Sequence, residues 1–490
     1  MLDTIEAIRL SFYGLSAELF VGATLIVLLL CSMIPALRKD FVLLTVAFVG
    51  LLFYFYFLMG YEEGPLFNGM LVNTYENILL RKLFFFATLL ALFQVAYQRD
   101  KLTQDKKLPE YLTMMFSIVL GGSLLVASRH FLMIFIAIEL LSITAYIFTT
   151  LPLSMNRVEA AIKYLIFGGV SSGVMLYGIS LIYATTGSLY IDADVLLNGF
   201  ALQESWIVLV VWIMIFAGVL FKLAAFPMHI WSPDVYQAVP SMSAAFITTV
   251  PKLAAFGLII SLIPTLKATL GDTIWYEFLS VIAIITITAG NLGALRQQNV
   301  RRMLAYSSIS HTGFLMVGLV AIDFEGLKNF MFYFVVYIIM KYAVFALTGL
   351  IERKAGFTKI EDYTGIKNRY SLIGVFFIII MISLTGLPPT AGFLSKLLVF
   401  SSLLGKYTAS GDQVLMVLFV VGLVNVVISL FYYLKIPYFI YFKSQEENKN
   451  DIPVLGNEKI YIGVLVITLV VLFIMPGWLL GMFNNISFAF

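Results

Sequence analysis

The sequence contains a single cysteine, Cys31, among its 490 residues. One cysteine excludes an intramolecular disulfide, and it also excludes a cysteine-ligated iron–sulfur cluster or zinc site within the chain. The chain therefore carries no obvious redox centre. We expect it to bind no cofactor or metal of its own.

Charged residues are scarce as well. They make up 12% of the chain, whereas apolar residues make up 61% and the mean hydropathy is +0.97. These values lie outside the range of soluble proteins and indicate a polytopic membrane protein, with the lipid bilayer as a partner. The net charge of +3 is small and is scattered over short loops, so the sequence presents no basic face for nucleic acid.

Long apolar runs are the main feature that is present. A helix of about 20 residues spans the ~30 Å hydrocarbon core of a bilayer. The sequence therefore predicts an all-α polytopic membrane protein, a single membrane domain over residues 1–490 with about 14 transmembrane helices. The predicted segments are 16–36, 40–60, 80–98, 109–128, 130–151, 159–186, 206–228, 241–264, 274–295, 302–322, 327–351, 371–404, 412–441 and 458–486.

The distribution of lysine and arginine predicts the orientation. An even number of helices places both termini on one side of the membrane. The odd-numbered loops carry 18 Lys and Arg, whereas the termini and the even-numbered loops carry 7. Because cytoplasmic loops hold the excess of basic residues, both termini are expected on the non-cytoplasmic side. A bacterial plasma membrane is the expected location.

Two stretches are too long and too interrupted to be plain helices. Residues 206–238 contain Pro227 and Pro233, and residues 371–404 contain the proline pair of 385–389 near their middle. Proline removes a backbone donor and clashes with the preceding turn. The freed polar groups are tolerated at membrane depth only against protein or water. Each stretch is therefore predicted to be a broken helix beside a hydrated interior.

The two broken helices suggest an internal repeat. Matched interruptions in two halves of a chain are typical of inverted-repeat transporters. Helices 4–8 (residues 109–264) and 9–13 (residues 274–441) form two five-helix units in which the fourth helix, 7 or 12, is broken. An odd number of helices inverts the second unit relative to the first. Helices 1–3 (residues 1–108) and helix 14 (residues 458–486) lie outside the repeat.

Five ionisable residues fall inside apolar segments. An ionisable side chain at the bilayer centre costs roughly 2.5–3.5 kcal/mol on insertion scales, so a chain that keeps several is expected to use them. At an effective dielectric near 20, a carboxylate about 4 Å from an ammonium attracts it by about 4 kcal/mol, enough to control whether the amine holds its proton. The five residues are Glu139, Lys222, Lys252, Lys341 and Lys396.

These charges predict a proton relay. We hypothesise that a charge change in an adjoining subunit shifts Glu139 and releases Lys222. A proton then moves through Lys252 toward Lys396. Alternatively, the buried charges are structural and pair with neighbouring subunits. In the relay, water and polar side chains of the tenth segment are expected to carry the proton: Ser307, Ser308 and His311.

Three stretches resemble signatures of the antiporter-like membrane subunits of respiratory complex I, the proton-pumping NADH:quinone oxidoreductase. Residues 221–236 resemble the family's seventh helix, residues 298–311 its tenth and residues 386–396 its broken twelfth. The similarity covers most of helices 4–13, whereas helices 1–3 and 14 match only in hydropathy. The resemblance implies a subunit of a translocase that takes part in electron transport.

The resemblance also implies roles for single residues. Lys341 departs from the family pattern and is either an additional relay member or a lysine paired with lipid or a neighbour. Lys396 distinguishes the chain from M-type subunits, which are expected to carry glutamate at that position. L-type subunits are expected to continue into a long lateral helix, which this sequence does not show. The N type (subunit 2) is therefore expected. By matching positions, Glu139 and Lys222 are the coupling pair, Lys252 is the eighth-helix lysine, Lys396 is the distal lysine and Glu110 is an accessory carboxylate.

Membership of this family implies cofactors and partners outside the chain. FMN, iron–sulfur clusters and quinone are expected in partner subunits, and K-type and M-type subunits are the expected neighbours. Two other functions remain open. One is a subunit of a multi-subunit sodium/proton antiporter, and the other is a membrane scaffold that transports nothing.

Overall fold

The computed structural model describes residues 2–99, 102, 104–369, 371–443 and 456–484. Within this part of the chain, 13 helices are long and apolar enough to cross a membrane. The remaining predicted segment, 371–404, is present as two consecutive helices, α18 (Ser371–Thr385) and α19 (Ala391–Ser410). The prediction of an all-α polytopic membrane fold is confirmed.

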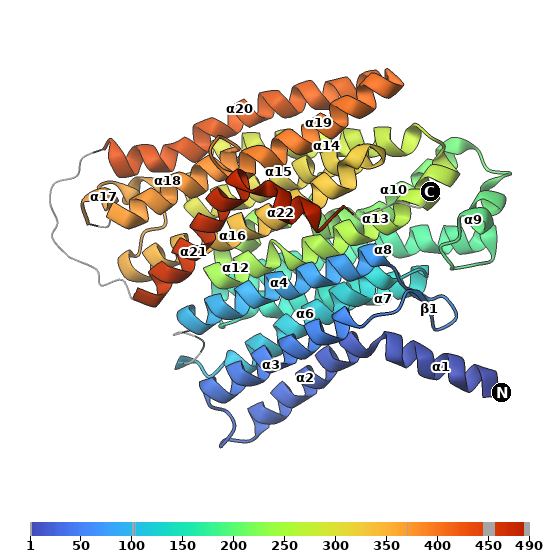
Figure 1. The fold of residues 1–490 in the computed structure, drawn as a ribbon, viewed down its shortest axis with the longest axis horizontal. Helices are drawn as coiled ribbons and strands as arrows, with labels where there is room; N and C mark the ends of the chain where they lie inside the picture. Colours follow the sequence, from blue (N-terminus) through green and yellow to red (C-terminus); the bar gives the residue numbers. More distant parts are fainter. Residues whose placement is uncertain (1, 100–101, 103, 370, 444–455, 485–490) are drawn as a thin grey trace. The chain divides into compact units, whose positions relative to one another are not determined.

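The chain folds into two compact units, of which the first combines residues 1–223 with 249–275. In this unit α6 packs against α2, α7 and α13, and α8 packs against α7 and α10 (Figure 1). A short antiparallel hairpin, β1 (Gly64–Leu66) and β2 (Leu71–Asn73), joins α3 to α4. The helices of the unit are α1 (Leu2–Gly14), α2 (Ser16–Met33), α3 (Asp40–Met59), α4 (Tyr75–Gln98), α6 (Leu108–Ala127), α7 (Phe131–Thr150), α8 (Met155–Thr186), α9 (Ala193–Phe200), α10 (Ser205–Leu223) and α13 (Val250–Leu270).

The second unit combines residues 224–248 with 276–490. Its central helix is α16, which contacts α12, α15, α19 and α21. α16 is apolar on all sides and almost fully buried, as expected for a helix enclosed by others. The elements of the unit are α11 (Trp231–Ala238), α12 (Ser241–Ile247), α14 (Ile274–Leu295), α15 (Val300–Val320), the π-helical turn η1 (Ile322–Gly326), α16 (Leu327–Ala355), the 3₁₀ turn η2 (Ile360–Tyr363), α17 (Ile366–Arg369), α18, α19, α20 (Gln413–Tyr441), α21 (Gly456–Ile474) and α22 (Pro476–Gly481).

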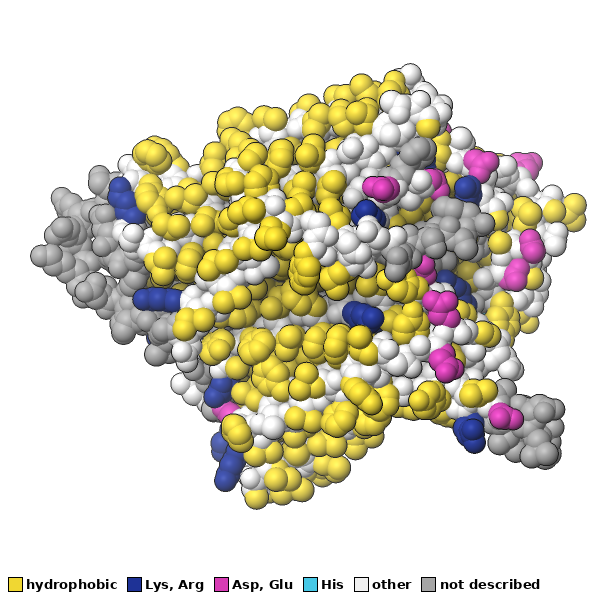
Figure 2. All heavy atoms as spheres, viewed as in Figure 1, with side chains coloured by type: hydrophobic (Ala, Val, Ile, Leu, Met, Phe, Trp, Pro, Cys, Tyr) yellow, Lys and Arg dark blue, Asp and Glu magenta, His cyan; other side chains and the backbone are white. Residues whose placement is uncertain are grey.

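The surface has the distribution of side chains that a bilayer requires. Figure 2 shows that apolar side chains cover the lengths of the helices on the visible face, whereas charged side chains gather near helix ends. Many large apolar residues of α2, α8 and α20 are exposed, as expected where the surrounding medium is hydrocarbon.

The seventh predicted helix is broken, as expected. α10 ends at Leu223, and the next residue, Ala224, has φ of +52°, in the left-handed region that non-glycine residues rarely adopt. Helical structure resumes only at α11. In the second unit the N–H group of Phe226 donates to Oγ1 of Thr286 at 3.1 Å, so the side chain of α14 satisfies a backbone donor that the break leaves free.

The twelfth predicted helix is also broken. α18 ends at Thr385, and Gly386 follows with φ of +86°, a conformation that glycine adopts without steric cost. The proline pair comes next, and α19 begins at Ala391. The interruption therefore lies where the prolines predict it.

The structure adds a third interruption that is not among the predicted breaks, although Pro251 in the first turn of α13 is a signal for a helix start. The eighth predicted segment consists of α12 and α13, separated by a turn at Thr248 and Thr249. The hydroxyl of Tyr337 on α16 donates to the carbonyl oxygen of Thr248 at 3.0 Å. A tyrosine from another helix thus satisfies an acceptor at the end of α12.

Candidate functional site

In the first unit, Lys222 on α10 and Glu139 on α7 form a loosely coupled pair of opposite charges. Lys222 is 2% exposed, and its Nζ has no hydrogen-bond partner among the described residues. The carboxylate of Glu139 acts electrostatically on Lys222, while its own Oε1 is buried without a hydrogen bond from the described chain. No hydrogen bond fixes the pair in one geometry, so a small displacement of Glu139 changes the field at the amine.

Aromatic rings surround the amine of Lys222. The Nζ atom lies 5.3 Å from the ring centroid of Tyr146, 5.5 Å from that of Tyr164 and 5.0 Å from that of Phe221. Ring faces attract a cation, although less strongly than a carboxylate does. The two tyrosines are not predicted from the sequence. One signal was available, because Tyr146 follows Glu139 by seven residues and so shares its face of α7.

The two other predicted residues of this unit differ in their surroundings. Lys252 is fully buried at the start of α13, directly after the turn at 248–249. Glu110 lies in the first turn of α6 with 36% of its side chain exposed, and its Oε1 is 3.7 Å from Arg38 and 3.6 Å from Lys107. Glu110 therefore belongs to a cluster of ion pairs at a helix end through Oε1, while its Oε2 is buried without a hydrogen bond from the described residues.

In the second unit, Lys341 begins a chain of hydrogen bonds through the interior. Its Nζ donates to Oγ of Ser307 at 3.3 Å, and that oxygen is hydrogen-bonded to the hydroxyl of Tyr433. The same hydroxyl is 3.2 Å from Nε2 of His311, whose Nδ1 is 2.8 Å from the hydroxyl of Tyr333. All five residues are buried. Three helices, α15, α16 and α20, thus supply one continuous polar path.

Ser308 belongs to a second branch. Its Oγ is 2.7 Å from the hydroxyl of Tyr337, which in turn donates to the carbonyl of Thr248 at the end of α12. The three predicted carriers on α15 are therefore all buried and hydrogen-bonded to tyrosines. The tyrosines come from α16 and α20, which are distant in sequence, and they are not predicted from the sequence.

Lys396 on α19 occupies the break in the twelfth helix. Its Nζ donates to the carbonyl oxygens of Leu384 at 3.3 Å and Thr385 at 2.7 Å, the last residues of α18. The amine also lies 4.6 Å from the ring centroid of Phe314. A cation at the carboxyl end of a helix is favoured by the helix dipole. The lysine borders a mostly apolar cavity of about 330 Å³ between α19 and α20.

The donor set does not fit a metal ion or an iron–sulfur cluster. Within the described residues, no three His, Cys, Asp or Glu side chains converge on one point. Cys31 is buried alone in α2. The predicted relay residues that are buried offer amines, one imidazole, hydroxyls and a carboxylate, all of which exchange protons.

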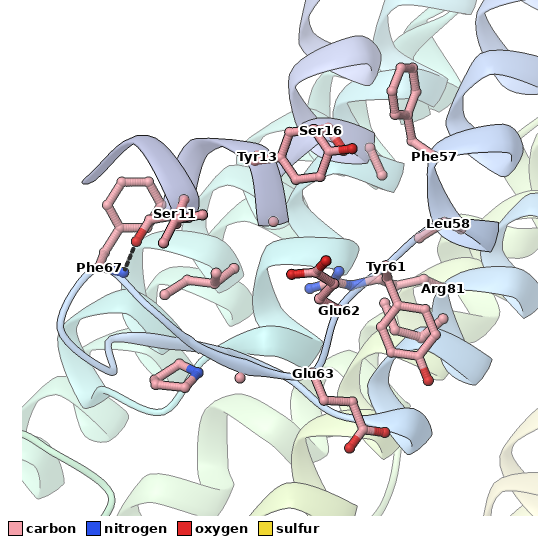
Figure 3. A pocket seen from close by; sticks show the side chains of 18 of the residues that line it. Ser11, Tyr13, Ser16, Phe57, Leu58, Tyr61, Glu62, Glu63, Phe67 and Arg81 are labelled. Carbon is pink, nitrogen blue, oxygen red and sulfur yellow. Dashed lines mark hydrogen bonds between the residues drawn. The ribbon is translucent and has the colours of Figure 1, made fainter. Parts of the chain in front are cut away.

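A larger cavity, of about 670 Å³, lies in the first unit between α1, the hairpin and the end of α3. Figure 3 shows Arg81 among its lining side chains, together with Glu62 and Glu63 from the loop after α3. The Nε of Arg81 is 3.3 Å from Oε1 of Glu18, and both side chains are at most 2% exposed. None of the predicted relay residues lines this cavity. The buried ion pair is not predicted from the sequence.

Comparison with known proteins places this site in a family. Residues 128–429 match the family described as NADH:quinone oxidoreductase/Mrp antiporter, TM. This segment contains every predicted site residue except Glu110. The NADH-quinone oxidoreductase subunit N of Chlorobium chlorochromatii is 33% identical over 449 residues, which cover 89% of this chain and 86% of the relative.

Solved structures agree in fold. A chain of respiratory complex I from Thermus thermophilus with bound aureothin is 25% identical and superposes with a TM-score of 0.74 over 95% of this chain and 98% of that one. A chain of the Mrp complex from a Dietzia species superposes with a TM-score of 0.77 over 96% of each chain. Its identity of 19% supports a shared fold alone.

Proposed function

Because this chain belongs to the NADH:quinone oxidoreductase/Mrp antiporter transmembrane family, we propose that it is the N-type (subunit 2) proton-translocating membrane subunit of an NADH:quinone oxidoreductase. The relatives named subunit N support the subunit type. One structural observation carries the proton-translocating role. Lys222 is a buried amine under the influence of Glu139 and is held by no hydrogen bond from the described residues.

The pair acts as a switch for proton release. While Glu139 stays near Lys222, its negative charge stabilises the ammonium. When Glu139 is drawn away, the buried ammonium loses that stabilisation and gives its proton to a water molecule that comes within hydrogen-bonding distance. An N–H bond breaks, an O–H bond forms on that water molecule, and a neutral amine remains. The proton then passes by way of Lys252 toward Lys396.

The second unit supplies carriers of the right kind. The imidazole of His311 takes up a proton on one ring nitrogen and releases one from the other, and it is hydrogen-bonded on both sides by tyrosine hydroxyls. Hydroxyl groups such as those of Ser307 and Ser308 both accept and donate. Lys341 donates into this path, which supports its role as an additional relay member.

The same proposal covers partners and location. FMN, iron–sulfur clusters and the quinone site belong to partner subunits, as membership of such an assembly implies, and one cysteine is too few to ligate an iron–sulfur cluster. Subunits of the K and M types are its neighbours in the assembly. The chain lies in a bacterial plasma membrane with both termini on the non-cytoplasmic side, as the balance of lysine and arginine favours.

Purification of the tagged chain from its native membrane tests the function. We expect it to bring down flavin, iron–sulfur signals and NADH:quinone activity, and we expect proton pumping to fall sharply in a Glu139→Gln variant. Glu159→Gln is the matched control, because Glu159 is 68% exposed on α8 and pairs only with Lys163 among the described residues.

The other outcomes identify the alternatives. Recovery of an assembly without redox centres, with sodium-dependent proton exchange, would support an antiporter subunit. Normal pumping in Glu139→Gln within an active oxidoreductase would support a scaffold that transports nothing.

A further inference from the structure

A buried lysine near the carboxyl end of α19 has no role in the relay described so far. Lys406 is predicted from the sequence to lie in a loop, but it belongs to α19 and only 6% of its side chain is exposed. Its Nζ donates to the carbonyl oxygen of Val320 at 2.8 Å and to Oδ2 of Asp323 at 3.3 Å. The amine also lies 4.1 Å from the ring centroid of Tyr276.

The partner carboxylate is accessible where the lysine is not. Asp323 lies in η1, the turn between α15 and α16, and 27% of its side chain is exposed. The pair therefore links a buried amine to a carboxylate in contact with the surroundings at one end of the second unit. The lysine and arginine balance predicts that this end is the non-cytoplasmic one.

Polar side chains lead from the interior path toward this pair. Tyr333, the last member of the path from Lys341, lies one turn from Asn329 on α16. The Nδ2 of Asn329 donates to Oγ of Ser402 at 2.7 Å. Ser402 in turn lies one turn before Lys406 on α19. Residues four apart on a helix lie on the same face, so Asn329 shares a face with Tyr333 and Ser402 shares a face with Lys406.

We propose that Lys406 and Asp323 are the proton-release pair of this chain, an inference that rests on the proposed function. When Lys406 has given up a proton and is a neutral amine, a proton arriving from the interior restores its ammonium. The ammonium passes it to Asp323, with one N–H bond broken and one O–H bond formed. The resulting carboxylic acid gives the proton to water outside, which restores the carboxylate. Asn329 and Ser402 are the polar side chains between this pair and the path that begins at Lys341, and water along them carries the proton, because a side-chain amide does not pass one on.

A purely structural role for Lys406 makes a different prediction. Lysine near the end of a helix often satisfies the last carbonyl groups, and here it caps α15 at Val320. Arginine at this position keeps the positive charge and the hydrogen-bonding capacity. However, a guanidinium does not release its proton in proteins. Lys406→Arg therefore retains the capping function and removes only proton transfer.

The test compares two variants in the intact assembly in proteoliposomes. We expect Lys406→Arg and Asp323→Asn to assemble normally and to oxidise NADH with a soluble electron acceptor at the wild-type rate. In both variants the ratio of protons pumped to NADH oxidised should fall. Lys354→Arg is the matched control, because Lys354 is an exposed lysine at the end of α16 and should pump as wild type does.

The outcomes separate this inference from the function on which it rests. Wild-type pumping by both Lys406→Arg and Asp323→Asn would overturn the release pair. If those two variants pump normally while Lys222→Ala does not, the release pair is wrong and the proposed function stands. If Lys222→Ala also pumps normally, the proposed function itself fails.

Discussion

The buried ion pair between Arg81 and Glu18 predicts a large loss of stability when it is broken. The two charged atoms are 3.3 Å apart, and the side chains are 1% and 2% exposed. At an effective dielectric near 20, this separation corresponds to an attraction of about 5 kcal/mol. Removing one partner of a buried pair typically costs ~3–5 kcal/mol, because the other charge stays buried and uncompensated.

Arg81→Met is therefore expected to destabilise the first unit by about 3–5 kcal/mol. Neither carboxylate oxygen of Glu18 accepts a regular hydrogen bond from the described residues, so Arg81 is the main group that compensates its charge. The variant also removes the hydrogen bond that Nη1 of Arg81 donates to Oδ1 of Asn73 at 3.0 Å. Glu18→Gln/Arg81→Met, which removes both charges, should recover most of the loss.

Stability can be measured as the midpoint temperature at which the detergent-purified assembly loses this chain. Cleavage by protease after heating reports the same event. If Arg81→Met is as stable as the wild type, the electrostatic reasoning is refuted. A double variant that is no more stable than Arg81→Met would refute it as well.

Two further predictions concern the broken helices. Gly386→Ala should reduce pumping as well as stability, because an added Cβ at φ of +86° would lie 2.7 Å from Cδ of Lys396. Gly411→Ala is the control and should reduce stability alone, because Gly411 has φ of +71° and an added Cβ would have no atom within 4 Å. Proteoliposome pumping and thermal unfolding of both variants check this. Tyr337→Phe should destabilise the second unit by about 1–3 kcal/mol, measured by thermal unfolding, because the buried carbonyl of Thr248 loses its donor.

Features that depend on the bilayer are predictable from the sequence. The length of a membrane span is fixed by the thickness of the hydrocarbon, so apolar runs identify the helices directly. The breaks after Leu223 and Thr385 are signalled by nearby prolines, since proline cannot continue the hydrogen-bonding pattern of a helix. The inversion of the two repeats stays a prediction, as do the relay roles assigned to single residues.

Features that depend on packing between distant helices are not predictable in this way. The turn at Thr248 and Thr249 is signalled by Pro251 in the first turn of α13, but the hydrogen bond from Tyr337 that supports it comes from another helix and has no local signal. The tyrosines around Lys222 and His311 likewise approach from other elements. The sequence predicts a helix end at residue 404, and so places Lys406 in a loop, because a 34-residue segment with an internal break gives no clear end.

The ratio of protons pumped to NADH oxidised tests the central claim most directly. It should be measured in proteoliposomes that contain the assembly with Lys222→Ala, with Lys163→Ala as control, because Lys163 is 44% exposed and forms an ordinary surface ion pair on α8. If Lys222 is a proton-loading site, the ratio falls in Lys222→Ala and coupled turnover slows, while the control matches the wild type. An unchanged ratio in Lys222→Ala would contradict the account.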